Sequence, residues 1–520
     1  MKKLLKTLII LAVLVAGGLT ALGFGLRSTI QEQVLNGLSN LSRSPQGKPY
    51  AASADQVEFS PFTREIFIRG LALRGEQANG PETWLASEIS FRLPLRMLLA
   101  LTPLRIMILK GNEPMNIAEN VVVRNLAMTT PYSRVLVQRE EMDVIRATPF
   151  IIGQALEGHE PIDMITATYE MGADTASAHF VSADIIDANG SVRVSFKEMR
   201  MSGWKGRSIA SLALDNMEVR IGGAQTMAVG RILQEGITLP EEGMIRQLVS
   251  LSENPEAEEA QEQLIPLMET MLNYDPPLLR KFQATDMTFA VDTSSVQVKE
   301  TQFEWFSNTP THTKSTIVGL TASSGLLHAV LGMTLPPLNM NMVFESRTTG
   351  TVSHKTADVR VPGLGQVACS LNMNDKPGPR MAEELFTQSF SDFTLSYKDD
   401  GGLAWTGLNL FPNVPQAAAT IEALAALPSI RDTPQNAVIR QNLQAFAARP
   451  GSLDIKTTPG RTVLVLDLIA VLDNPGMLLT ISGSPGDHAL VEQMETLRLT
   501  FEAIRALNAQ QQQQQQQQQQ

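Results

Sequence analysis

The sequence has few of the residues on which metal, redox and nucleophilic chemistry depends. Its 520 positions include one cysteine, Cys369, and aromatic residues make up only 5%. A single cysteine excludes an intrachain disulfide, a cysteine-based zinc site and a dithiol redox motif. The six histidines are His159, His179, His312, His328, His354 and His488. None stands four residues from another, as two zinc ligands on one helical face would, so we expect no metal and no cofactor.

Motifs of the common enzyme classes are also missing. The chain contains no Gly-x-Ser-x-Gly elbow, Walker loop or EF-hand loop. Residues 363–368 have glycines spaced as in a dinucleotide fingerprint, but they lie among short predicted strands, which indicates a loop. Two adjacent carboxylate pairs, Glu140 with Glu141 and Asp399 with Asp400, are expected to point to opposite faces of a strand or into water on a turn. The sequence therefore predicts a protein that is not an enzyme.

Charge and hydropathy set two further limits. Hydrophobic residues make up 43% and charged residues 18%, which is typical of a folded chain. The formal net charge is -11. The first 26 residues contain three lysines and no acid, so the remainder has 39 basic against 53 acidic residues, a net charge of -14. This acidity argues against nucleic acid as a partner.

The first 26 residues have the pattern of a membrane-targeting segment. Lys2, Lys3 and Lys6 precede an uncharged run over residues 8–26, which as a helix is about 28 Å long, close to the thickness of the hydrocarbon core. No Ala-x-Ala cleavage motif precedes Arg27, so we favour a retained signal anchor over a removed signal peptide. Because lysines stay on the cytoplasmic side, we expect a single-pass protein of the bacterial inner membrane, with the bulk of the chain in the periplasm.

Alternating apolar residues predict β-structure after a stalk at residues 27–52. The first β region is expected over residues 53–225, where residues at i and i+2 share one face of a strand. Residues 104–109 are predicted as a strand after a short helical interruption at 97–101, and residues 209–214 and 217–221 as two separate strands. Asn189-Gly190 between two alternating runs indicates a hairpin.

The rest of the chain alternates between helix and strand. We predict a helical insertion at 226–279, a second β region at 280–410, and a segment at 411–507 with helices, two strands at 452–457 and 462–469, and a terminal helix. Residues 508–520, rich in glutamine, are expected to be a disordered tail. The four tryptophans fall in segments interpreted as strand-rich, where they either line a ligand surface or anchor the sheet: Trp84, Trp204, Trp305 and Trp405.

The first 130 residues resemble the start of AsmA-like envelope proteins. The resemblance rests on the order of an anchor, Val57-Glu-Phe-Ser-Pro-Phe, Ile66-Phe-Ile-Arg-Gly70-Leu-Ala-Leu73, Ile89-Ser-Phe-Arg-Leu-Pro-Leu95 and Leu104-Arg-Ile-Met-Ile-Leu-Lys-Gly111. It implies an anchored, curved β-groove of a group that includes bridge-like lipid transporters, and it implies no catalytic residue. The predicted fold is therefore mainly β with helical insertions, built as an elongated, curved antiparallel sheet after a transmembrane anchor.

The leading functional hypothesis is a non-enzymatic envelope protein whose β body contacts membrane lipid or another hydrophobic ligand, in support of outer-envelope assembly or lipid homeostasis. A periplasmic scaffold or assembly factor that binds envelope protein partners is the alternative, and an exported hydrolase with a site built from distant residues is a third. Acyl chains buried against the sheet would gain about 0.8 kcal/mol per CH₂. The residues predicted to form the membrane end of the groove are Ile66, Ile68, Leu71, Leu73, Ile89, Phe91, Leu93 and Leu95.

Overall fold

The computed structural model describes two compact units. The described residues are 51–503, except 78–79, 102–103, 158–163, 188–189, 223–224, 254–263, 265, 268–269, 272–276, 292–293, 309–310, 324–337, 375–388, 412, 428, 459–460, 465–473 and 501. The boundary between unit 1 and unit 2 lies at Asp292 and Thr293.

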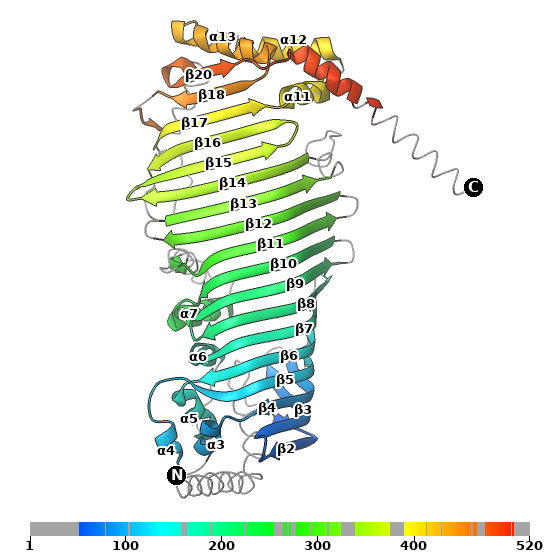
Figure 1. The fold of residues 1–520 in the computed structure, drawn as a ribbon, viewed down its shortest axis with the longest axis vertical. Helices are drawn as coiled ribbons and strands as arrows, with labels where there is room; N and C mark the ends of the chain where they lie inside the picture. Colours follow the sequence, from blue (N-terminus) through cyan, green and yellow to red (C-terminus); the bar gives the residue numbers. More distant parts are fainter. Residues whose placement is uncertain are drawn as a thin grey trace, which may run out of the picture. The chain divides into compact units, whose positions relative to one another are not determined.

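Unit 1 is a long antiparallel sheet (Figure 1). Its strands are β1 Ala51–Ser53, β2 Gln56–Ser60, β3 Glu65–Gln77, β4 Gly80–Arg92, β5 Met115–Thr129, β6 Ser133–Ala147, β7 Met171–Asp187, β8 Gly190–Lys205, β9 Ser208–Ile221, β10 Gln225–Thr238 and β11 Leu279–Val291. Strands β1 and β2 both pair with β3, and from β3 to β11 each strand pairs with the next along the chain. The predicted Asn-Gly hairpin is confirmed, because Asp187 pairs with Gly190 across a two-residue connection.

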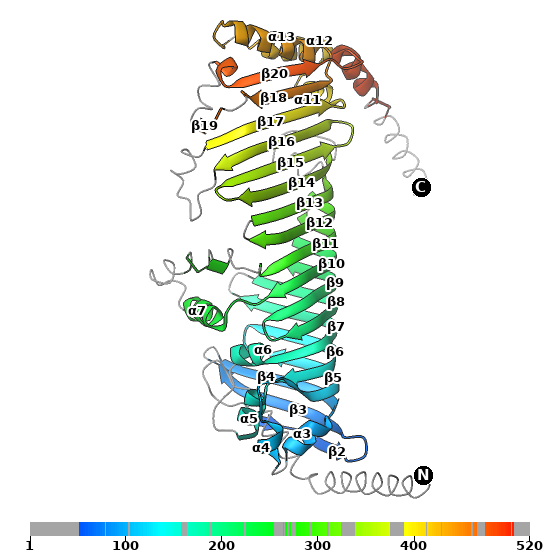
Figure 2. The same cartoon turned by 60° about the vertical axis from the view of Figure 1, so that its left-hand side comes forward.

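The helices of unit 1 lie at one edge of this sheet. Among the described residues they include α3 Leu95–Ala100, α4 Arg105–Ile108, α5 Pro149–Glu157, α6 Met164–Glu170 and α7 Glu242–Glu253. All five follow the ends of β4, β6 and β10, whereas the turns at the opposite edge contain two or three residues. Figures 1 and 2 show α5, α6 and α7 beside that edge. None of these five helices follows a strand that ends at that other edge.

A line of kinks crosses the middle of the unit 1 sheet. Asn125 in β5, Phe180 in β7, Asn216 in β9 and Asp286 in β11 all have φ near +50° (50°, 51°, 53° and 52°), and Gly70 in β3 has φ +61°. The register on either side of each kink is unbroken, but a positive-φ residue leaves the extended conformation and shifts the side-chain alternation by one position. Such shifts explain why alternation in the sequence changes phase within single strands.

These kinks account for the main errors of strand prediction. Residues 209–214 and 217–221 form the single strand β9, whose alternation is reset at Asn216. Strands β5 and β6 were not predicted; β5 carries positive φ at both Asn120 and Asn125, which breaks its period of two.

Strand β10 occupies the first part of the expected helical insertion at 226–279, and the described helix α7 begins only at Glu242. Residues 104–109 contain the short helix α4 rather than a strand, since so short an apolar run fits either form.

Unit 2 contains a second antiparallel sheet. Its strands are β12 Ser294–Asn308, β13 Thr311–Ala322, β14 Leu338–Thr349, β15 Val352–Val361, β16 Gly365–Asn374, β17 Ser389–Asp399, β18 Ser452–Thr457, β19 Val463–Leu464 and β20 Leu479–Ser484. Strands β12 to β17 pair in chain order, β17 also pairs with β18 and β19, and β20 pairs with β18. Strands β16 and β20 were not predicted, and residues 365–368, expected as a loop, belong to β16.

Helices cover the β18 and β20 end of unit 2. They are α11 Gly402–Leu410, α12 Val414–Ala425, α13 Pro434–Ala448 and the short 3₁₀ helix η1 Pro475–Met477. Asn413 and Thr433 cap α12 and α13 by accepting hydrogen bonds from the backbone N–H groups of Gln416 and Asn436. A final helix is described over residues 490–500, which confirms the predicted terminal helix; its residues Leu490 and Met494 are buried against α11 and α12.

The fold is mainly β with helical segments, as predicted. Within the part of the chain that the structure describes, none of the helices combines the length and the apolar character needed to cross a bilayer. The predicted anchor at residues 1–26, nearly all of the stalk at 27–52 and the glutamine-rich tail lie outside the described residues, so these predictions stay predictions.

Candidate functional site: an apolar sheet face

One face of the unit 1 sheet is apolar from β3 to β11. Residues that pair across antiparallel strands lie on the same face, so the register defines rows of side chains that run across the strands. The first row consists of Ile68, Ile89, Val123, Glu140, Ala178, Met199, Leu214, Ile232 and Ala284. The second row consists of Leu73, Trp84, Met128, Val135, Ala183, Val194, Val219, Met227 and Phe289.

A third row on the other side of the first has the same character. It contains Val121, Met142, Ala176, Met201, Leu212, Gln234 and Phe282. We call the three rows together the apolar face of unit 1. Ala178 and Val181 belong to one buried cluster although they are three residues apart, because the kink at Phe180 returns both to this face.

The apolar face is closed at one end and half-open along the rest. Leu98 of α3 is buried in a cluster with Ile66 and Ile68 of β3, and Met97 and Leu101 pack against the same cluster. Further along the sheet, Met199, Leu214 and Ile232 are only half-buried, and Phe289 is 41% exposed. Helix α3 therefore covers the β3 end, and the stretch towards β11 offers apolar surface to solvent.

The eight residues predicted to form the membrane end of the groove lie at this closed end. Five are buried in the cluster, namely Ile66, Ile68, Leu71, Leu73 and Leu93. Ile89 and Phe91 pack against that cluster, whereas Leu95 is the first residue of α3 and is 38% exposed. Their role in ligand binding stays a prediction. Their burial adds about 1.5–3 kcal/mol of stability for each large side chain.

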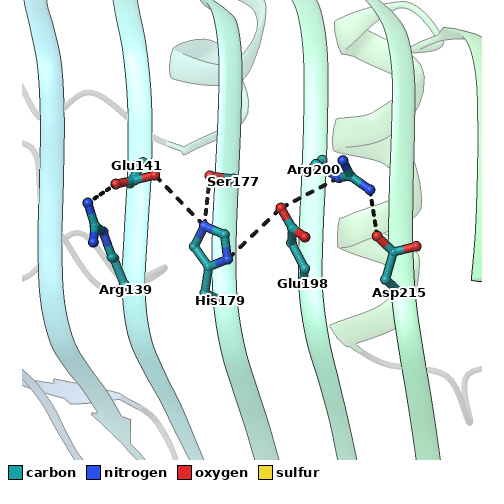
Figure 3. A network of polar contacts seen from close by, with 7 residues as sticks. All are labelled: Arg139, Glu141, Ser177, His179, Glu198, Arg200 and Asp215. Carbon is teal, nitrogen blue, oxygen red and sulfur yellow. Dashed lines mark hydrogen bonds and ion pairs between the residues drawn. The ribbon is translucent and has the colours of Figure 1, made fainter.

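The opposite face of the same strands is charged. One register row contains Arg69, Glu88, Arg124, Arg139, His179, Glu198, Asp215 and Arg231. Arg200 links two of these acids, with its Nη2 2.7 Å from Asp215 Oδ2 and its Nε 3.6 Å from Glu198 Oε1. Figure 3 shows the part of this ladder between β6 and β9. The pairs are largely exposed, so each contributes little to stability, but together they keep this face wet.

His179 stands in the middle of the charged face with a serine and two acids around it. Its Nε2 is 3.3 Å from Ser177 Oγ, and its Nδ1 is 3.9 Å from Glu198 Oε1 (Figure 3). The atoms follow the order of a serine–histidine–acid triad, but 3.9 Å is too long for the hydrogen bond that orients the base. Strand β7 lies between β6 and β8, so the ladder occupies the N–H groups that an oxyanion hole would need. This arrangement fits an ion-pair ladder better than a catalytic centre.

A shallow hollow of about 600 Å³ lies on the charged face beside His179. Its lining includes Arg124, Arg139, Glu141 and the side chain of Phe180, which is 55% exposed. Arg124 and Arg139 face each other in the register, but each has an acidic neighbour, Glu88 and Glu141. The hollow is open, and its charges are already compensated, so the apolar face is the better candidate for ligand binding.

Unit 2 repeats the one-sided pattern. One row contains Phe303, Ser315, Phe344, Ala357, Cys369, Leu395, Ile455 and Ile481. Several of these residues line a hollow of about 260 Å³ that is mostly apolar, and burial raises the pKa of the Cys369 thiol. At the β18 end α13 packs on this face, where the rings of Tyr397 and Phe446 meet edge to face at 6.0 Å.

Other candidates in the sequence have structural roles. Asp399 was expected to face water, but it is 8% exposed and accepts hydrogen bonds from the Tyr397 hydroxyl and from two backbone N–H groups. Trp204 and Trp305 each donate to a backbone carbonyl two residues ahead, and Trp405 lies in α11 rather than in a strand. Among the described residues, no group of three His, Cys, Asp or Glu side chains is arranged to hold a metal ion.

Comparison with models of known protein families, with curated proteins and with solved structures finds no match to this chain. The sheet geometry is therefore the basis for assigning a function.

Proposed function

We propose that this protein is an envelope protein whose β body binds the hydrocarbon of lipids on the apolar face of unit 1. The observation that carries the proposal is the nine-strand register row from Leu73 to Phe289, in which every side chain is apolar. The other face of the same strands is charged, so the apolar side chains are concentrated on one face of the sheet.

The width of the face suits an acyl chain. Adjacent strands lie about 4.8 Å apart, so the five steps from β6 to β11 span roughly 24 Å. One leaflet accounts for about half of a 30 Å hydrocarbon core, or roughly 15 Å. A chain laid across β7 to β11 would run along a row of apolar side chains and gain about 0.8 kcal/mol per CH₂ removed from water.

The rest of the proposal follows from the N-terminal sequence. A signal anchor at residues 1–26 would hold the chain on the bacterial inner membrane with the β body in the periplasm. In that position the protein would act without catalysis in envelope assembly or lipid homeostasis. A scaffold for protein partners would be favoured if α7 presented an apolar stripe to solvent. It is less well supported, because Met244, Leu248 and Leu251 of α7 are half-buried.

Photocrosslinking in cells tests the proposal with the full chain. Benzoylphenylalanine placed at Val194 lies on the apolar face, and the same residue placed at Ser195 lies on the opposite face of β8. We expect lipid adducts by mass spectrometry from position 194 and few or none from position 195. Adducts with protein at position 194 would favour the scaffold, and equal lipid adducts at both positions would contradict binding by the apolar face.

Introducing a charge provides a second check. Ala183→Asp places a carboxylate in the second apolar row, and Ser182→Asp places one at the adjacent position on the opposite face. We expect the first variant to reduce crosslinking from position 194 at least fivefold and the second to leave it unchanged.

A further inference from the structure

One charged side chain interrupts the apolar face. Glu140 is the eighth of the 15 residues of β6, and it pairs in the register with Val123 on one side and Ala178 on the other. It is the only charged residue in the three rows of the apolar face, which contain one other polar residue, Gln234.

The carboxylate of Glu140 has no protein partner within the described residues. No hydrogen bond or ion pair reaches it there, and the side chains that face it from β5 and β7 are Val121, Val123, Ala176 and Ala178. The charged residues next to it in sequence, Arg139 and Glu141, lie on the opposite face. Burial raises the pKa of Glu140, as is usual for a carboxyl group among apolar neighbours.

Glu140 lies between the covered part and the open part of the apolar face. The strands on one side of it, β3 to β5, are closed by α3 and its buried cluster, which also contacts Val123. The strands on the other side, β7 to β11, carry the half-buried apolar residues Met199, Leu214 and Ile232. Glu140 therefore stands where the covered part of the apolar face meets its open part.

We propose that Glu140 binds the cationic amine of an aminophospholipid whose acyl chain lies across β7 to β11. This inference rests on the proposed lipid-binding function and adds the class of headgroup. An ammonium group supplies both the opposite charge and the hydrogen-bond donors that the half-buried carboxylate lacks among the described residues. An anionic headgroup at the same place would meet a like charge among apolar neighbours, where screening by water is weak.

The test measures headgroup preference with the full chain. Protein carrying benzoylphenylalanine at Val194 is mixed with vesicles of equal parts phosphatidylethanolamine and phosphatidylglycerol with identical acyl chains, and the adducts are counted by mass spectrometry. We expect the ethanolamine lipid to exceed the glycerol lipid at least fivefold. Glu140→Gln should bring the ratio to about one, and Glu140→Lys should reverse it. Glu141→Gln, the adjacent carboxylate on the other face, should leave the preference intact.

Each outcome bears on a different claim. Adducts in the vesicle ratio with the unaltered chain, or a preference that survives Glu140→Gln, would overturn the role of Glu140 and leave the lipid-binding function standing. No lipid adduct from position 194 would overturn both. Thermal unfolding of each variant shows whether it is folded, and the conservative Gln variant provides the decisive comparison if the Lys variant does not fold.

Discussion

Glu140 and Glu141 are consecutive residues of β6, yet their carboxylates lie on opposite faces of the sheet in opposite environments. Glu140 faces Val123 and Ala178, whereas Glu141 forms an ion pair with Arg139 and lies 3.8 Å from Nε2 of His179. Burial among these apolar neighbours raises the pKa of Glu140. We therefore expect Glu140, and not Glu141, to contribute a pH-dependent loss of stability.

We predict that Glu140→Gln stabilises the lipid-free protein at pH 7 and has little effect near pH 4. A folded-state pKa above the unfolded value means that ionisation is harder in the folded protein, so stability is lost as pH rises above the unfolded pKa. A neutral amide does not carry this penalty. Chemical denaturation at both pH values measures the free energy of unfolding, with Glu141→Gln as the control. A Glu140→Gln variant that is less stable than the parent at pH 7 would contradict the prediction.

The Arg146–Asp174 pair between β6 and β7 should have the reverse pH dependence. Arg146 Nη2 donates to Asp174 Oδ2 at 2.6 Å, and this hydrogen bond lowers the pKa of Asp174 below its ordinary value of 3.8. Its stabilisation is present above that value and is lost as pH falls through the lowered pKa. Asp174 is part-exposed, so the effect is modest. We expect Asp174→Asn to lower the free energy of unfolding at pH 7 but not at pH 2.

Phe180 adopts a backbone conformation that suits a different residue. Its φ of +51° is left-handed, and its side chain is 55% exposed, so little packing compensates for the strain. We predict that Phe180→Asn stabilises the protein by about 1 kcal/mol, since asparagine tolerates this region. Lys197→Asn, at the neighbouring position of β8, should bring no gain. A loss of stability in Phe180→Asn would mean that the ring contributes more than the strain costs.

Asp399 should be important for the junction between β17 and α11. Its Oδ1 accepts from the Tyr397 hydroxyl at 2.6 Å and from the Leu403 N–H at 2.9 Å, and its Oδ2 accepts from the Gly401 N–H at 3.0 Å. We predict that Asp399→Ala lowers the free energy of unfolding of unit 2 by about 2–4 kcal/mol, because buried donors lose their acceptor. Asp400→Ala, on the exposed side of the same turn, should cost less than about 0.5 kcal/mol.

Some helices and strands could be predicted from the sequence, and others could not. Helices α12 and α13 and strand β18 were predictable because their signals are local: proline at the first turn of each helix, and short-range alternation in the strand. Strand β5 was missed and β9 was divided, since Asn120, Asn125 and Asn216 change the phase of alternation, and asparagine is also typical of turns.

By itself, the sequence determined that the chain is mainly β, that its strands have one apolar side, and that it lacks the motifs of common enzymes. These properties follow from composition and from period-two alternation, which act over a few residues. Only the tertiary structure decided which alternating residues share a face, because strand register and the line of kinks set that choice across nine strands. For the same reason Glu140 is just one of two adjacent acids in the sequence, and the register alone places it among apolar neighbours.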